Sequence, residues 1–127
     1  MRFRFPLLPA ELEIPDAWWT EAGMTAFCQS AQSYGCTPDA IAVPLREIEP
    51  PFRNPEVMRD WRGFDRERLV RILGGIATDA EIEPVPVIAL PRTDFREGPF
   101  RYRVRDGLHR FYASVPATFE CLPVVVQ

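Results

Sequence analysis

Residues 104–114, Val-Arg-Asp-Gly-Leu-His-Arg-Phe-Tyr-Ala-Ser, mark the point where a strand is expected to turn into a helix. The backbone N–H groups of a helix's first turn lack partners within the helix and carry the positive end of its dipole, so such a junction favours an anion. Gly107 allows a ligand to approach the backbone closely, and Arg110 can donate to two oxygens at once. His109 is the one histidine of the chain, and Asp106 can hold a metal ion or accept a proton. The stretch therefore predicts a phosphate or carboxylate site.

The residues before this junction predict a β-hairpin. Residues 100–105, Phe-Arg-Tyr-Arg-Val-Arg, alternate apolar side chains that face the core with arginines that face solvent. Val85 to Leu90 is a short apolar run that suits a buried strand, and Pro91 to Gly98 is a polar turn between the two.

Two helices and two further strands complete the predicted fold. Asp65 is expected to cap a helix with an apolar stripe at helical spacing, and this stripe is made of Leu69, Ile72, Leu73, Ile76 and Ala77. The helix after Gly107 is expected to run to about Val115, because Pro116 disfavours its continuation. Short strands begin near Ile41 and Leu122. The order strand, helix, strand, strand, helix, strand predicts an α+β fold, a small mixed β-sheet with packed helices.

Residues 1–40 are predicted to form an N-terminal extension, an arm plus a helix, packed on a domain of residues 41–127. Phe3 and Phe5 alternate with arginines, as in an edge strand or an extended arm, and the prolines that follow keep the segment irregular.

The helix of this extension is expected to be capped by Asp16 and to end at Gly35. Trp18 and Trp19 are adjacent, so both cannot point into one core at helical spacing. One of them is expected to cover a neighbouring surface or a ligand pocket instead.

Composition limits the classes of function. A chain of 127 residues forms one domain with a real core. Its net charge of −3 disfavours nonspecific nucleic-acid binding as the main activity. All 15 basic residues are arginine, which excludes lysine chemistry, and the three cysteines form no C-x-x-C pair, so we expect reduced thiols. The lack of an apolar run long enough for a signal sequence or a membrane span predicts a cytoplasmic protein.

The order and spacing of five segments resemble the ParB/sulfiredoxin-like superfamily. The segments are Ile41 to Ile48, Phe64 to Leu69, Ile82 to Val87, Tyr102 to Ser114, and Leu122 to Val126. The resemblance covers about residues 41–127 and implies the α+β fold of that superfamily. In relatives, the turn that matches Asp106 to Arg110 opens the helix that receives nucleotide phosphates.

Two members of the superfamily differ from this chain within that turn. Partition proteins carry Gly-Glu-Arg-Arg, whereas Leu108 stands here at the glutamate and His109 at the first arginine. Those proteins also continue into a helix-turn-helix domain after the last strand. Sulfiredoxin carries Gly-Cys-His-Arg, so Leu108 replaces its catalytic cysteine. A sulfiredoxin reaction is therefore not expected, and a DNA-binding partition protein or a nuclease is the least favoured interpretation.

A third form of the turn, Asp-Gly-His-His-Arg, is more similar to this sequence and occurs in nucleotide-dependent kinases that act on a free amino acid. This resemblance implies that Gly107, Leu108, His109 and Arg110 line a phosphate site, with His109 also polarising the phosphate. Asp106 would be the base or a magnesium ligand, and the implied ligand is ATP, ADP or CTP with Mg²⁺.

Two further contributions to that site are proposed from the loop after the first strand. Arg53 is a candidate for a second phosphate contact. Such kinases also use a glutamate of this segment, and Glu47, Glu49 and Glu56 are all candidate bases, between which the sequence does not choose.

The sequence thus predicts a nucleotide- or phosphate-binding domain, with phosphotransferase or nucleotide-hydrolase activity as a further expectation. The alternative is a noncatalytic interaction module, a toxin–antitoxin or mobile-element partner or a homodimer, that makes its contacts through residues 1–40. Each site residue also has a purely structural alternative. Asp106 could cap its helix, Arg110 could pair with a carboxylate such as Glu56, and His109 could be hydrogen-bonded within the fold. No metal site made by the protein alone is expected.

Overall fold

A five-stranded mixed sheet forms one side of the domain. The protein is described by a computed structural model over residues 2–4, 11–91 and 100–127, and its main sheet has the strand order β3-β7-β5-β6-β4. The strands are β3 (Ile41–Pro44), β4 (Ile48–Glu49), β5 (Val85–Ala89), β6 (Tyr102–Val104) and β7 (Cys121–Val126). β7 is parallel to β5 and antiparallel to β3, whereas β6 is antiparallel to β5 and parallel to β4. The predicted α+β class is confirmed.

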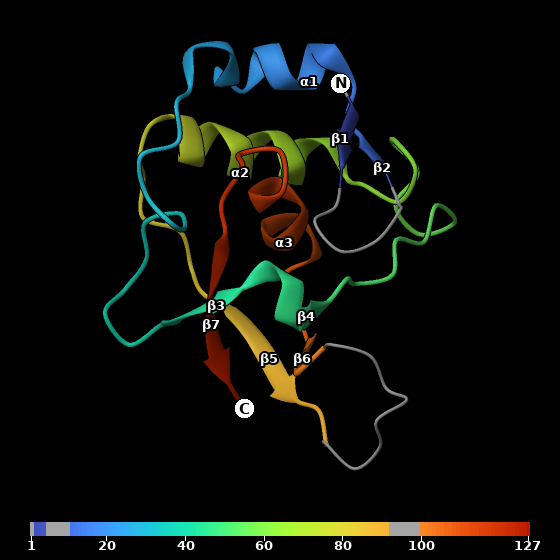
Figure 1. Cartoon of the computed structure of the whole chain (residues 1–127). Coiled ribbons are helices and arrows are strands. Elements are labelled where there is room, and N and C mark those ends of the chain that lie inside the picture. The colour runs from blue at the N-terminus through green and yellow to red at the C-terminus, as the bar shows by residue number, and fades with distance from the viewer. Residues whose placement is uncertain (1, 5–10, 92–99) are drawn as a thin grey trace.

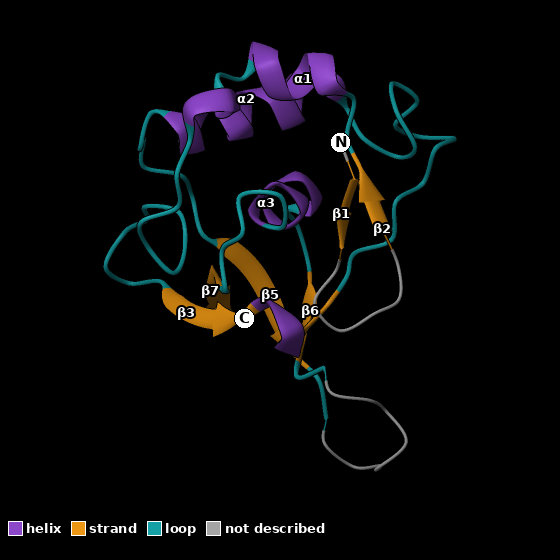
Figure 2. Ribbon diagram, turned by 45° about the horizontal axis from the view of Figure 1, so that its top comes forward, coloured by secondary structure: helices purple, strands orange, loops and turns teal. Residues whose placement is uncertain are grey.

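The helices of the described residues are stacked on one face of this sheet. They are α1 (Asp16–Glu21), α2 (Arg66–Ala77) and α3 (Leu108–Ser114). Both ribbon views place α3 between the sheet and α2, and Figure 1 shows α1 on the far side of α2 (Figure 1; Figure 2). Covered on two sides, α3 has no solvent exposure at Phe111 and Ala113. The chain therefore holds its predicted anion-binding turn, at the start of α3, beside α2.

Helix α2 follows its predicted pattern. The carboxylate of Asp65 accepts a hydrogen bond from the backbone N–H of Arg68 at 3.1 Å, as an N-cap does. Leu69, Leu73 and Ile76 of the apolar stripe are buried. At 12 residues α2 is the longest helix in the described part of the chain, and none of the helices there could span a bilayer.

The hairpin predicted from the alternating arginines is also confirmed. β5 and β6 pair in antiparallel register, with Val87 opposite Val104, and Arg103 is exposed between two half-buried neighbours. The polar turn predicted over 91–98 lies almost wholly outside the described residues. The sequence pattern does not predict β4, because a strand of two residues is too short to show an alternation of apolar and polar side chains.

The edge strand predicted for the N-terminal segment is present, and it belongs to a second small sheet whose other strand the sequence pattern does not predict. β1 (Arg2–Arg4) pairs antiparallel with β2 (Glu11–Glu13), so the extended arm is one strand of a hairpin. Phe5 and the two prolines that follow it belong to residues 5–10, which lie outside the described part.

The predicted N-terminal helix is wrong in both of its ends. α1 spans six residues, its N-cap is Pro15 rather than Asp16, and no side chain caps it. Gly23 adopts φ +80°, a left-handed conformation that stops an α-helix well before Gly35, and a single 3₁₀ turn follows it. Trp18 is buried in the core, and Trp19 is half-buried and packed against the same core.

Apolar side chains of the N-terminal segment belong to the same core as the rest of the domain. Ile14, Met24 and Tyr34 are at most 3% exposed. The indole N–H of Trp61 donates to the backbone carbonyl of Glu13 at 3.0 Å, which fixes this segment to the loop before α2. The core side chains of residues 12–34 are therefore part of one folding unit with the main sheet.

Two glycines provide a test of the backbone geometry. A Cβ at Gly74, inside α2, would meet its nearest atom, the carbonyl oxygen of Ala22, at an ordinary 3.6 Å. We expect Gly74→Ala to raise the free energy of unfolding by about 0.5–1 kcal/mol, because alanine favours helix.

Gly63 has φ +89°, and its Cβ would lie 2.5 Å from the Cβ of Arg53. Gly63→Ala should lower the free energy of unfolding by about 2 kcal/mol or more.

Urea denaturation of the two variants beside the wild type measures both effects. A Gly74→Ala variant less stable than the wild type would contradict the spacing of α1 and α2 described above.

Candidate functional site

The predicted anion-binding turn opens onto a hollow between α2 and the start of α3. The hollow has a volume of about 470 Å³. Its lining residues are Met58, Arg68, Arg71, Ile72, Asp106, Gly107, Leu108, His109 and Arg110. The structure thus brings together all five residues of the predicted turn and adds a wall that comes from α2 and the loop before it.

Two arginines of α2 make this wall cationic. Arg68 and Arg71 are three positions apart on the helix, so their side chains emerge on one face, and both residues are exposed. Neither guanidinium has an ion-pair partner within the part of the chain that the structure describes, whereas Arg66 on the same helix pairs with Glu21. Two unpaired guanidinium groups beside one hollow favour an anionic ligand.

Arg110 is held over Gly107 by backbone carbonyls. Its Nη1 donates to the carbonyl oxygen of Pro84 at 2.7 Å and to that of Glu83 at 3.3 Å. A Cβ at Gly107 would lie 3.1 Å from Nη2 of Arg110 and 3.2 Å from Nε, and the φ of +123° also favours glycine. The structural alternative that pairs Arg110 with Glu56 is therefore wrong, and the Nε and Nη2 edge of the guanidinium faces the turn.

Asp106 does not cap α3. The N-cap of this helix is Gly107, and no side chain makes a capping hydrogen bond there. Asp106 is exposed and is the one acidic residue among those lining the hollow. The capping alternative is therefore wrong, and the carboxylate lies where a ligand in the hollow could reach it.

His109 connects the two helices that frame the hollow. Its Nε2 accepts a hydrogen bond of 2.9 Å from the backbone N–H of Asp65, the N-cap of α2. The ring is 5% exposed and lies 6.0 Å from the Phe64 ring, centre to centre. Burial lowers the pKa of His109 from its ordinary value of 6.5 and outweighs the opposing effect of the Asp65 carboxylate, while Arg68 lowers the pKa further. A neutral ring with an accepting Nε2 carries its proton on Nδ1.

The other predicted site residues lie elsewhere. The guanidinium of Arg53 lies 5.2 Å from the centre of the Phe64 ring and 5.1 Å from that of Tyr112. Glu47 and Glu49 form ion pairs with arginines of the β6 region, at 3.0 and 3.3 Å. Glu56 is exposed in a turn, where Asn54 accepts a hydrogen bond from its backbone N–H. None of these four lines the hollow.

Sequence reasoning missed the α2 side of the hollow. Arg68 and Arg71 flank the predicted apolar stripe, and their spacing of three residues is the one signal that the sequence offers. An exposed arginine on an amphipathic helix is most often a solvated residue. Only the packing of α2 on α3 therefore shows that these two arginines lie beside the predicted turn.

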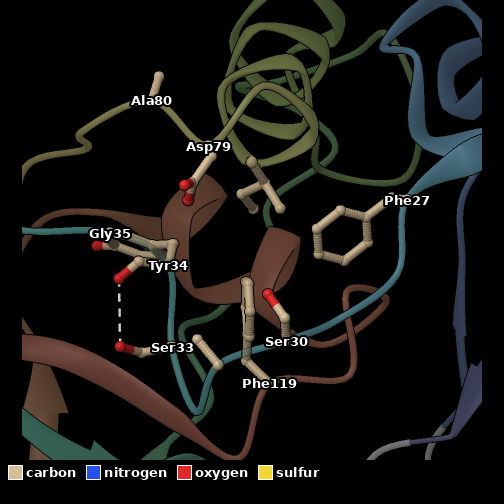
Figure 3. A pocket seen from close by; sticks show the side chains of 10 residues that line it. Phe27, Ser30, Ser33, Tyr34, Gly35, Asp79, Ala80 and Phe119 are labelled. Carbon is tan, nitrogen blue, oxygen red and sulfur yellow. Dashed lines mark hydrogen bonds between the residues drawn. The ribbon is translucent and has the colours of Figure 1, made fainter.

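Two other cavities lie away from the predicted turn. The cavity in Figure 3 is lined by Phe27, Tyr34 and Phe119 among others and has a volume of about 30 Å³, enough for a single water molecule. A groove near Cys121 is larger, but burial raises the pKa of this thiol and neighbouring glutamates raise it further. A protonated thiol is a poor nucleophile. Within the described residues, no three His, Cys, Asp or Glu side chains gather into a metal site.

Comparison with known proteins gives one similarity of fold. No protein-family model matches the chain, and no curated protein sequence matches it. The crystal structure of sulfiredoxin from Arabidopsis thaliana is similar to it, with a TM-score of 0.48 and 20% sequence identity over 69% of this chain and 83% of that chain.

The buried His109 predicts a specific pH dependence of stability. Because its pKa is lower in the folded protein than in the unfolded chain, acid favours unfolding. This stabilising contribution is complete at a pH above the pKa of the unfolded chain. It is lost as the pH falls below about 6.5, with a slope of at most about 1.4 kcal/mol per pH unit. Urea denaturation across this range should show the decline, and His109→Gln should remove it.

The imidazole proton resonances of the one histidine give an independent readout by NMR. A titration midpoint at or above 6.5 would contradict the buried, hydrogen-bonded ring.

Proposed function

We propose that the hollow between α2 and α3 binds the phosphate groups of a small ligand, with nucleotides as the first candidates. The observation that supports this function is the convergence of Arg68 and Arg71 with the turn at Gly107. Phosphate oxygens accept the paired N–H donors of guanidinium groups, and the strongest such contacts involve two donors on one anion.

Each cation would have a distinct role. Arg68 and Arg71 are exposed on a helix surface, so their side chains can turn towards a ligand as it binds. Arg110 is already fixed by the carbonyl of Pro84, and the Nε and Nη2 edge over Gly107 is its remaining donor set. A preorganised arginine costs less entropy on binding than a mobile one does.

Asp106 suits a magnesium ion that arrives with the nucleotide. Mg²⁺ is commonly held by one or two carboxylates together with phosphate oxygens and water. Since Asp106 is the sole carboxylate lining the hollow, the ligand itself would complete the coordination. Magnesium would neutralise phosphate charge there, while the arginines orient the phosphate groups.

The catalytic part of the proposal is phosphoryl transfer or nucleotide hydrolysis, in which Asp106 would serve either as the base or as the magnesium ligand, because one carboxylate does not do both at once. Glu47, Glu49 and Glu56 are not needed for this role, because they lie outside the hollow. His109 is a positioning residue in this scheme, since its Nε2 is used to hold the N-terminus of α2 and thereby the two arginines.

The alternative of a noncatalytic interaction module has less support. The aromatic side chains of residues 1–40 include Trp18, which is buried in the core, and Trp19 and Phe27, which are partly buried against it. Their packing within the domain leaves less of them available to a partner in the folded protein.

Isothermal titration calorimetry with ATP, ADP and CTP, each with Mg²⁺, tests binding. We expect Arg71→Gln to raise the dissociation constant of the nucleotide by about 10- to 100-fold, because a charge-assisted hydrogen bond contributes about 1.5–3 kcal/mol. Arg105→Gln is the matched control, since Arg105 is exposed and donates to Gln127 away from the hollow. Absence of binding by the wild type, or equal loss in both variants, would contradict a phosphate site here.

Phosphate release from the bound nucleotide tests catalysis separately. Asp106→Asn should keep binding of the magnesium-free nucleotide within about threefold, since no carboxylate contact to phosphate is lost, while turnover falls by at least about 100-fold. Turnover that is unchanged in Asp106→Asn would show that this carboxylate is not the base.

A further inference from the structure

The hollow has an apolar wall in addition to its arginines. Met58, Ile72 and Leu108 all line it, and each of the three residues is only half-buried. They come from three different segments, the loop before α2, α2 itself and the first position of α3. Their meeting at one hollow therefore depends on the packing of α3 against α2.

Charged and apolar groups are interleaved on α2. Ile72 lies four positions after Arg68, one turn along the same face, and directly follows Arg71. An anion held by these arginines would thus lie within reach of the Ile72 side chain. Leu108 is next to Gly107 in the turn, so the fixed Arg110 has an apolar neighbour as well.

Such a hollow is not optimal for a bare phosphate ion. A ligand that covers the exposed parts of the three side chains gains the free energy of burying apolar surface. A ligand with polar groups at the same place would leave its hydroxyls without partners on this wall. The arrangement favours a phosphate ester that also carries an aromatic or aliphatic group able to reach this wall.

We propose that Met58, Ile72 and Leu108 form an apolar subsite that selects phosphate esters with an aromatic or aliphatic group over those with a sugar at the same position. The inference rests on the proposed phosphate site and adds the class of ligand to it. Leu108 is a specificity-determining residue in this scheme, and the base of a nucleotide is one group that could occupy the subsite.

Phenyl phosphate and ribose 5-phosphate are suitable probes, because both are phosphate monoesters and they differ in the group attached. Calorimetry should give a preference for phenyl phosphate of about tenfold, the effect of covering roughly 55 Å² of apolar surface. Leu108→Asn should reduce this preference to within about twofold. Arg71→Gln should raise the dissociation constants of both esters by the same factor, so that the ratio of the two constants does not change.

Met58→Gln is the second variant, since it keeps the side-chain length and lies in a loop, outside the helices. It should lower the affinity for phenyl phosphate alone. Equal affinity of the wild type for the two esters would overturn the apolar subsite while leaving the phosphate site intact. Binding of neither ester would overturn the phosphate site itself.

Discussion

The hydrogen bond from the backbone N–H of Asp65 to Nε2 of His109 is the interaction on which the candidate site depends. It joins the N-cap of α2 to the first turn of α3, and these two helices provide the two sides of the hollow. Water cannot easily replace either partner, because the imidazole is buried. The positions of Arg68 and Arg71 relative to Gly107 therefore depend on a neutral His109.

A second constraint fixes the other side of the turn. Arg110 lies between the carbonyls that precede β5 and the backbone of Gly107, and a Cβ at Gly107 would also lie 3.1 Å from Cγ1 of Val85. The absence of a side chain at this position lets the guanidinium and the strand approach together. One glycine thus serves both the fold and the site, since the arginine that it admits is part of the hollow.

Local cues predicted the elements whose cause is local. The Asp65 carboxylate caps α2, and the alternation around Arg103 gives β6, because both effects act within a few residues. The end of α1 at Gly23 escaped prediction, since helical spacing continues past it in the sequence. For the site, the turn from Asp106 to Arg110 was predicted, whereas Arg68 and Arg71 join it through the packing of two helices.

Charge illustrates the same distinction between sequence and structure. The net charge of −3 disfavours binding to nucleic acid over a broad surface, yet the hollow carries three arginines and one aspartate. At physiological salt, charges more than about 8 Å apart are largely screened, so a small anion in the hollow responds to the nearest guanidinium groups. An acidic protein can therefore offer a cationic site to a phosphate group. The carboxylates that balance the arginines elsewhere, such as Glu47 and Glu49, are paired with other arginines and do not weaken this local field.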